Sequence, residues 1–293
     1  MSSSRVAWLV AGMGFVTLGG LLAARATSLP RRYVSEVRHA LACEASSRAG
    51  RSPRVVTDDD LVHLPALVAT YLRRAGVVGK PRVVDFHARF RARMRTARDA
   101  PWMKATVDQY DFFDGSPRRF FLMRASRAGV PFVAFHRYVG DEATMQVRAA
   151  GLVDVVDARG AEMTESETVT LFNDICVFAP AALLGAPVTW QPLGNREVRA
   201  TYTNAGHTIS AVLTFDAAGD LANFVSNDRH QSDGKASRRL PWSTPFSDYR
   251  GFAGARLPAF GAARWREPDG AEWSYIELTL ERIDYDLGRA QGG

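Results

Sequence analysis

The chain has 293 residues, of which 46% are hydrophobic and 23% charged, so it is long enough to bury a large core in one or two globular domains. Its formal net charge of +6 is uneven, because residues 1–100 carry 17 Lys/Arg against 7 Asp/Glu and the remainder carries 20 against 24. Arginine supplies 34 of the 37 basic residues, a skew typical of G+C-rich coding. With no nucleic-acid-binding fold signature, the positive charge does not indicate a nucleic-acid partner.

Residues 6–24 contain no charged side chain. At about 1.5 Å per residue, a helix of this length spans about 28 Å, close to the thickness of the hydrocarbon core of a bilayer. We therefore predict an N-terminal transmembrane helix, so that residues 1–30 form a membrane anchor or signal segment and the protein is located at the membrane. Cleavage at the Ala-x-Ala pattern that ends at Ala26, followed by export, is the alternative. The side of the membrane on which the domain lies stays open.

Residues 31–57 are predicted to form a juxtamembrane helix and a linker. The main unit is expected to be a single α+β domain over residues 58–286, followed by a disordered tail at 287–293. The domain begins with a helical pattern at 57–76, in which Pro65 either starts or kinks the helix.

From residue 82 the hydrophobic period changes to two. Phe86, Phe90 and Met94 alternate with the four arginines from Arg89 to Arg95, which predicts a half-buried antiparallel strand with its basic face toward solvent. More strands follow, separated by turn sequences, up to a helix predicted at 164–185 with a break or kink at Pro180. A second run of strands ends at residue 286.

The order of helix, strands, helix and strands lacks βαβ alternation. It predicts an α+β fold with a large curved antiparallel sheet, half-barrel-like, crossed by a helix and preceded by the N-terminal transmembrane helix. We expect an apolar cavity between the crossing helix and the sheet.

Motifs that would name a reaction are missing, since the sequence contains no GxSxG, P-loop, GxGxxG or HExxH pattern. Cys43 and Cys176 lack metal-ligand spacing. We therefore expect no metal and no cofactor, and the catalytic residues, if any, are unknown. The acidic residues Glu162, Glu165 and Glu167 are typical of the first turn of a helix.

Two segments depart from regular patterning. Asn173 and Asp174 interrupt an apolar helical run, and 226–252 is a polar, aromatic segment too long for a hairpin loop. Both either line a pocket or bond neighbouring backbone. The candidate ligand-binding residues are Asn173, Asp174, Asp228, Arg229, His230, Trp242, Ser243, Thr244 and Tyr249.

The stretches "LPALVATYLRRAGVVGKP", "TESETVTLFNDICVFAPAALLG" and "PWSTPFSDYRGF" resemble an uncharacterised bacterial family of domain-of-unknown-function proteins. Members of that family also have an N-terminal hydrophobic segment. The resemblance covers about residues 58–286 and implies one unit without an established activity.

Three functions are compatible with these observations. The first is a membrane-tethered protein that binds an apolar or amphipathic, lipid-like ligand on its curved sheet, with the membrane as a partner through residues 6–24. The second is a hydrolase that uses Asp228 or Asp174 with His230 near a loop at 226–249. The third is a structural module of an envelope complex.

Overall fold

The computed structural model describes residues 25, 27–232 and 237–287. The helices are α2 (Ser28–Arg48), the 3-10 helix η1 (Asp59–Leu61), α3 (Ala66–Ala75), α4 (Ala161–Phe178) and the 3-10 helix η2 (Pro180–Gly185). The strands are β1 (Asp85–Met94), β2 (Met103–Phe112), β3 (Arg118–Arg127), β4 (Val130–Val139), β5 (Glu142–Ala149), β6 (Val153–Ala158), β7 (Val188–Pro192), β8 (Glu197–Asn204), β9 (His207–Phe215), β10 (Leu221–Ser232), β11 (Ser237–Phe252), β12 (Ala255–Arg266) and β13 (Glu272–Tyr285).

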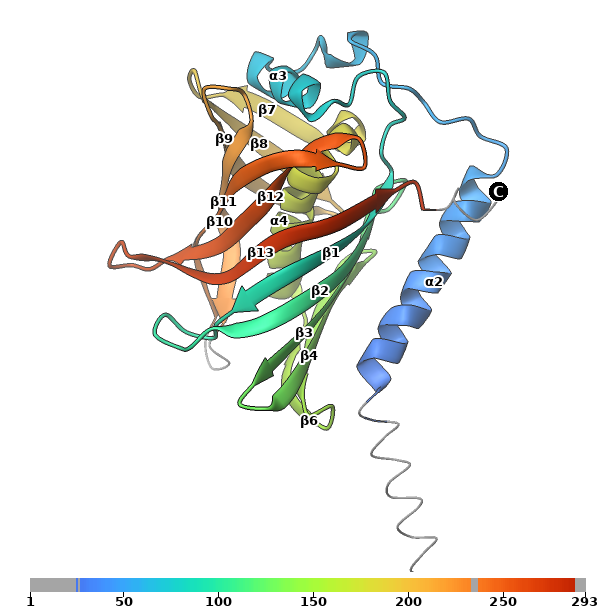
Figure 1. Cartoon of the computed structure of the whole chain (residues 1–293). Coiled ribbons are helices and arrows are strands. Elements are labelled where there is room, and N and C mark those ends of the chain that lie inside the picture. Colours follow the sequence, from blue (N-terminus) through green and yellow to red (C-terminus); the bar gives the residue numbers. More distant parts are fainter. Residues whose placement is uncertain (1–24, 26, 233–236, 288–293) are drawn as a thin grey trace, which may run out of the picture.

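All of these strands form one antiparallel sheet in the order β6-β5-β4-β3-β2-β1-β13-β12-β11-β10-β9-β8-β7. The pairing of β1 with β13 joins the two runs of strands, and β6 and β7 are left at the two edges. Since α4 follows β6 and η2 leads into β7, the chain passes from one edge to the other across the concave face (Figure 1). The predicted curved antiparallel sheet with a crossing helix is confirmed.

The concave face and α4 form the main core. Phe172 of α4 stacks on Tyr202 of β8, with ring centroids 4.8 Å apart, and Phe178 packs edge-on against Phe90 of β1. Burial of each such side chain contributes about 1.5–3 kcal/mol. At one end of the sheet, Tyr71 of α3 donates a hydrogen bond of 2.7 Å to the carbonyl oxygen of Cys176, which ties α3 to the end of α4.

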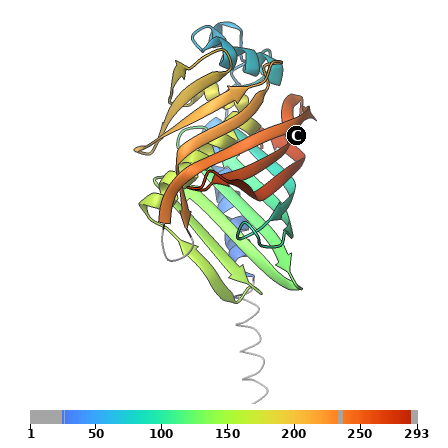
Figure 2. The same cartoon turned by 90° about the vertical axis from the view of Figure 1, so that its left-hand side faces the viewer.

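Helix α2 lies on the opposite, convex face (Figures 1 and 2). Its buried residues Tyr33 and Val37 pack in a second apolar cluster with Phe120 and Phe135 of the sheet. At its last residue, the Arg48 guanidinium lies 2.6 Å from the buried carboxylate of Asp85. The predicted juxtamembrane helix is therefore a docked part of the folded unit.

The alternating arginines of β1 lie on the convex face, as predicted. Arg91 and Arg93 are more than half exposed, and each forms a 2.6 Å ion pair with an acid of β13, respectively Glu281 and Glu277. Because the pairs are exposed, they contribute little to stability.

Two helix predictions hold with shifted bounds, and one loop prediction is wrong. The helix predicted at 57–76 starts after Pro65, and the one at 164–185 divides at Ala179 into α4 and η2. The long loop predicted within 226–252 is wrong, because β10 and β11 extend through it as a paired hairpin. Pro241 and Pro245 hide the strand pattern, since proline lowers the expectation of a strand.

The predicted transmembrane segment at 6–24 and most of the predicted tail lie outside the described residues. Within the described ranges, no helix is long and apolar enough to cross a membrane. Both cysteines are free: Cys43 is exposed on α2, and Cys176 is buried on α4.

Candidate functional site

The two segments singled out in the sequence meet in the structure. Asn173 of α4 donates a hydrogen bond of 2.8 Å to the Thr244 hydroxyl of β11. Close by, the guanidinium carbon of Arg229 lies 4.5 Å from the centroid of the Trp242 ring. The same guanidinium donates a hydrogen bond to the Thr170 hydroxyl of α4. Four of the predicted residues thus form one contact between α4 and the β10–β11 hairpin.

The other predicted residues do not converge on that contact. The Tyr249 hydroxyl donates a hydrogen bond of 2.7 Å to the carbonyl oxygen of Leu221, and Ser243 lies in β11 opposite Val225. Asp174 contacts Gln109 of β2 and Arg119 of β3 instead.

The acid–histidine arrangement of the hydrolase alternative is not formed by its three candidates. His230 Nε2 lies 2.8 Å from Glu165, and Asp228 accepts a hydrogen bond of 2.7 Å from the Ser210 backbone N–H. The carboxylate of Asp174 contacts Arg119. Each of the three side chains has a different partner. Neither Asp228 nor Asp174 is therefore bonded to His230 in a way that would make it a base.

A buried charge cluster missed by the sequence analysis joins α4 to the sheet. The Arg119 guanidinium of β3 donates to Asp174 at 2.7 Å and to Glu167 at 3.0 Å. Gln109 of β2 donates to Asp174 at 2.8 Å and to Asp111 at 3.1 Å. All five side chains are buried, so the cluster has the geometry of an attachment between helix and sheet.

The carboxylates of this cluster differ in their electrostatic environment. Burial raises the pKa of Asp111 well above its usual range, and the nearby Asp174 carboxylate adds to the effect. Burial also disfavours the Glu167 carboxylate, but Arg119, His136 and Arg229 outweigh it and hold the pKa of Glu167 well below its usual range. Glu167 is therefore charged and Asp111 is favoured in its neutral form.

The signal for this cluster was present in the sequence. Arg119 occupies an inward position in the alternation that contains Phe121 and Met123, where an arginine requires a buried partner. Glu167 and Asp174 are seven residues apart and share a helix face. Glu167 resembled a first-turn acid only because the predicted helix began at residue 164 instead of Ala161.

The cavity expected beneath the crossing helix is not found along α4. Its side chains from Thr164 to Phe178 are almost all buried, since the helix itself fills the concave face there. In the described part of the chain, no cluster of three or more His, Cys, Asp or Glu side chains is arranged to hold a metal ion.

A continuous apolar surface extends across the concave face toward the last residues of β1 and β3, Met94 and Arg127. Direct pairing links Leu278 to Ala92, Ala92 to Ala105 and Ala105 to Ala125, and paired residues point to the same face. The "apolar strip" consists of Ala92, Met94, Met103, Ala105, Met123, Ala125, Phe132, Ala134, Val147, Ile276 and Leu278.

Solvent reaches part of this apolar strip. Six of its side chains are only partly buried, namely Ala92, Met94, Phe132, Val147, Ile276 and Leu278. Alanine at three consecutive paired positions of β1, β2 and β3 keeps the side chains short in the middle of the strip. The strip is therefore apolar, several strands wide and incompletely covered.

The sequence profile of a family of unknown function, DUF6544, matches residues 54–278. The chain belongs to this family. The resemblance to an uncharacterised domain family is thereby confirmed, and the DUF6544 match brings no established activity. No curated protein matches the chain.

Several solved structures are similar to this DUF6544 protein, with low sequence identity and low TM-scores. A DUF1329 family protein from Desulfovibrio piger is 13% identical, with 76% of this chain and 93% of that chain covered and a TM-score of 0.44. A LolA superfamily protein from Nitrosomonas europaea is 12% identical, with 78% and 93% covered and a TM-score of 0.42. A putative outer membrane lipoprotein-sorting protein domain from Vibrio parahaemolyticus is 12% identical, with 69% and 86% covered and a TM-score of 0.37. Because the identities and TM-scores are this low, the description of the fold is based on the strand pairing of this chain alone.

Proposed function

We propose that this protein is a membrane-tethered binding protein for a lipid-like ligand, which it holds on the concave face of its sheet at the apolar strip. The observation that carries the proposal is the partial exposure of six apolar side chains on that face. Apolar side chains that solvent reaches on one face of a folded domain are typical of a binding surface. Residues 6–24 would supply the tether.

The chemistry of the strip favours a hydrocarbon chain over a polar ligand. All of its side chains are aliphatic, thioether or aromatic, so they offer no hydrogen bond that would orient a polar group. Each buried CH₂ group of a ligand contributes about 0.8 kcal/mol. An acyl chain laid across several strands could therefore offset the cost of its immobilisation.

Adjacent residues of β1 provide a matched test. Ala92 points into the apolar strip, and Arg91 points to the convex face. Ala92→Glu and Arg91→Gln each lower the net charge by one, but only the first places a charge in the strip. We expect lipid to be recovered with the purified wild-type chain by native mass spectrometry, and a fluorescent fatty acid to bind it.

Ala92→Glu should weaken fatty-acid binding by at least about tenfold, because a charge beside the acyl chain must be desolvated. Arg91→Gln should bind like the wild type. Thermal unfolding of both variants checks that they are folded. A wild-type chain that carries no lipid and binds no fatty acid would rule the proposal out, as would equal affinities for the two variants.

A further inference from the structure

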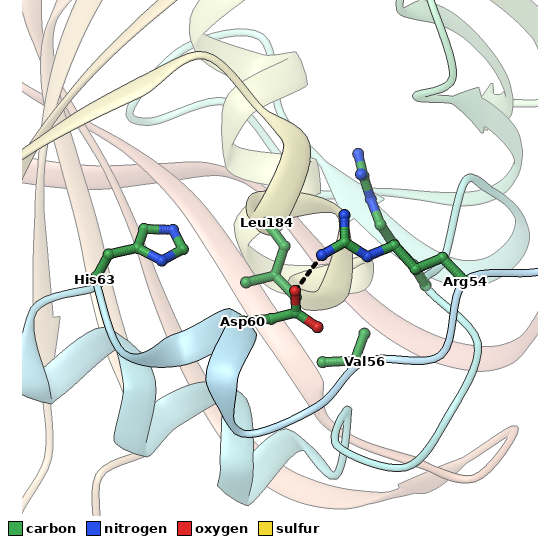
Figure 3. A pocket seen from close by; sticks show the side chains of 6 residues that line it. Arg54, Val56, Asp60, His63 and Leu184 are labelled. Atoms are coloured by element: carbon green, nitrogen blue, oxygen red, sulfur yellow. Dashed lines mark hydrogen bonds and ion pairs between the residues drawn. The ribbon is translucent and has the colours of Figure 1, made fainter.

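A second site, remote from the apolar strip, lies between the segment before η1 and the end of η2. A pocket of about 240 Å³ is lined by Arg54, Val56, Asp60, His63, Arg82 and Leu184 (Figure 3). It is smaller than pockets that hold drug-sized molecules, which measure about 300–1,000 Å³. Its size suits a small group.

Two arginines are placed side by side at this pocket by the backbone. Val55 and Pro81 form an antiparallel β-bridge. Next to it, the backbone N–H of Arg82 donates a hydrogen bond of 2.8 Å to the backbone carbonyl oxygen of Arg54. Arg54 and Arg82 are therefore directly opposite each other, with Cβ atoms expected about 4.5–5.5 Å apart. Like charges at directly opposite positions are destabilising.

Only one of these arginines has a carboxylate partner within the described chain. Arg54 bonds Asp60, whose second oxygen accepts the Thr57 backbone N–H at 2.9 Å. The Nε of Arg82 is buried and has no hydrogen-bond partner among the described residues. The pocket is therefore lined by two guanidinium groups and one carboxylate, which leaves an excess of one positive charge.

The position of the Arg82 side chain depends on a glycine. A Cβ atom at Gly185 would lie 1.5 Å from Nη2 of Arg82, so any other residue would displace the guanidinium. Gly185 thus makes room for Arg82 at the pocket, beside Leu184. His63 faces the same space and offers an imidazole N–H (Figure 3).

We propose that this pocket binds a phosphate group, held by the guanidinium groups of Arg82 and Arg54. A guanidinium presents N–H donors in a planar fork that matches phosphate oxygens. The apolar side chains of Val56 and Leu184 suit a small organic portion beside the phosphate, so the ligand is a phosphate ester, either free or as a lipid headgroup.

This site is independent of the proposed function. The β1 strand runs from Asp85, close to Arg82, to Met94 in the apolar strip, a distance of about 30 Å at about 3.3 Å per residue. Binding at the pocket and at the strip can therefore fail separately.

Calorimetric titration of the full chain with inorganic phosphate, glycerol 3-phosphate and a short-chain phosphatidylglycerol tests the pocket. Arg82→Gln removes the charge, and Gly185→Ala keeps every charge but displaces the Arg82 side chain. Both should weaken binding by at least about tenfold, because a charged hydrogen bond is lost. Arg127→Gln, at an exposed position in β3, is the control for charge alone and should bind like the wild type.

Comparable affinity for glycerol 3-phosphate and phosphatidylglycerol would identify a free phosphate ester, and much tighter, Arg82-dependent binding of the lipid would identify a headgroup. Absence of binding by the wild type to all three probes would overturn the proposal. So would an equal loss in Arg82→Gln and Arg127→Gln. Ala92→Glu should leave phosphate binding unchanged, which separates this result from failure of the proposed function.

Discussion

Arg119 holds two carboxylates of α4 against the sheet, at 2.7 Å and 3.0 Å. Taking three charges out of water is costly, and the cost is met only while every partner is present. The bonds that attach α4 are therefore mutually dependent.

Substitution of Arg119 by methionine should show this dependence. Arg119→Met keeps the side-chain volume but leaves Asp174 and Glu167 buried without their guanidinium, so the free energy of unfolding should fall by about 3–5 kcal/mol. Urea denaturation at neutral pH measures the change. Arg282→Met, which breaks an exposed pair with Asp284, is the control and should leave the midpoint close to that of the wild type. A small change in Arg119→Met would mean that Arg119 does not attach α4.

Asp111 should give stability a distinct pH dependence. Its pKa is raised in the folded state, above the unfolded value of about 3.9. Stability from the neutral carboxyl is therefore fully present below that unfolded value and is lost as pH rises through the folded pKa.

Asp111→Asn imitates the neutral form at every pH. The variant should be more stable than the wild type at pH 7, and the difference should shrink as the pH falls toward 4. Urea midpoints at the two pH values provide the comparison. A difference that does not depend on pH would show that Asp111 is charged in the folded chain.

At the scale of elements, the sheet is covered by a helix on each face. Helix α4 connects the two edge strands and fills the concave face, and α2 packs on the convex face through its own apolar cluster. The Tyr33 hydroxyl adds a 3.0 Å hydrogen bond to the Asp108 carbonyl oxygen. Docking of α2 should therefore be separable from the integrity of the main core.

Two neighbouring valines of α2 allow a test of that separation. Val37 is 5% exposed and Val34 is 41% exposed. Val37→Asp would bury a carboxylate in the α2 cluster, so amide exchange across residues 28–48 should accelerate by at least about tenfold while α4 stays protected. Val34→Asp should leave the exchange nearly unchanged. If Val37→Asp accelerated exchange equally in α4, the helix and the core would unfold together.

At the scale of the whole molecule, the tether and the apolar strip are two parts of the proposed function. Under that proposal, a hydrophobic segment at 6–24 would hold the lipid-binding face next to a bilayer. The described domain supplies no other candidate for a membrane-spanning helix.

Alkaline carbonate extraction of cells that express the full chain measures this tether. We expect the full chain to stay in the membrane pellet, because about 28 Å of apolar helix is long enough to span the hydrocarbon core. A chain that starts at Ser28 should appear in the supernatant. Release of the full chain by carbonate, or its recovery as a shortened exported form, would contradict an uncleaved anchor.

The sequence by itself determined most of the local structure of this protein, with the β10–β11 hairpin as an exception. Alternation of Phe86, Phe90 and Met94 with arginine defines β1 and its two faces, and Pro180 lies at the predicted break between α4 and η2, because these signals depend only on neighbouring residues. The sequence order of strands and helices was enough to predict a curved sheet crossed by a helix.

Only the tertiary structure decided which residues meet. It brought Asn173 to Thr244 but directed Tyr249 elsewhere, and it paired Arg119 with acids on α4 more than forty residues away. It also placed Arg54 directly across from Arg82, next to the single β-bridge between Val55 and Pro81. Such contacts join segments distant in the chain, and their partners follow from sheet order and helix placement, which no short stretch of sequence encodes.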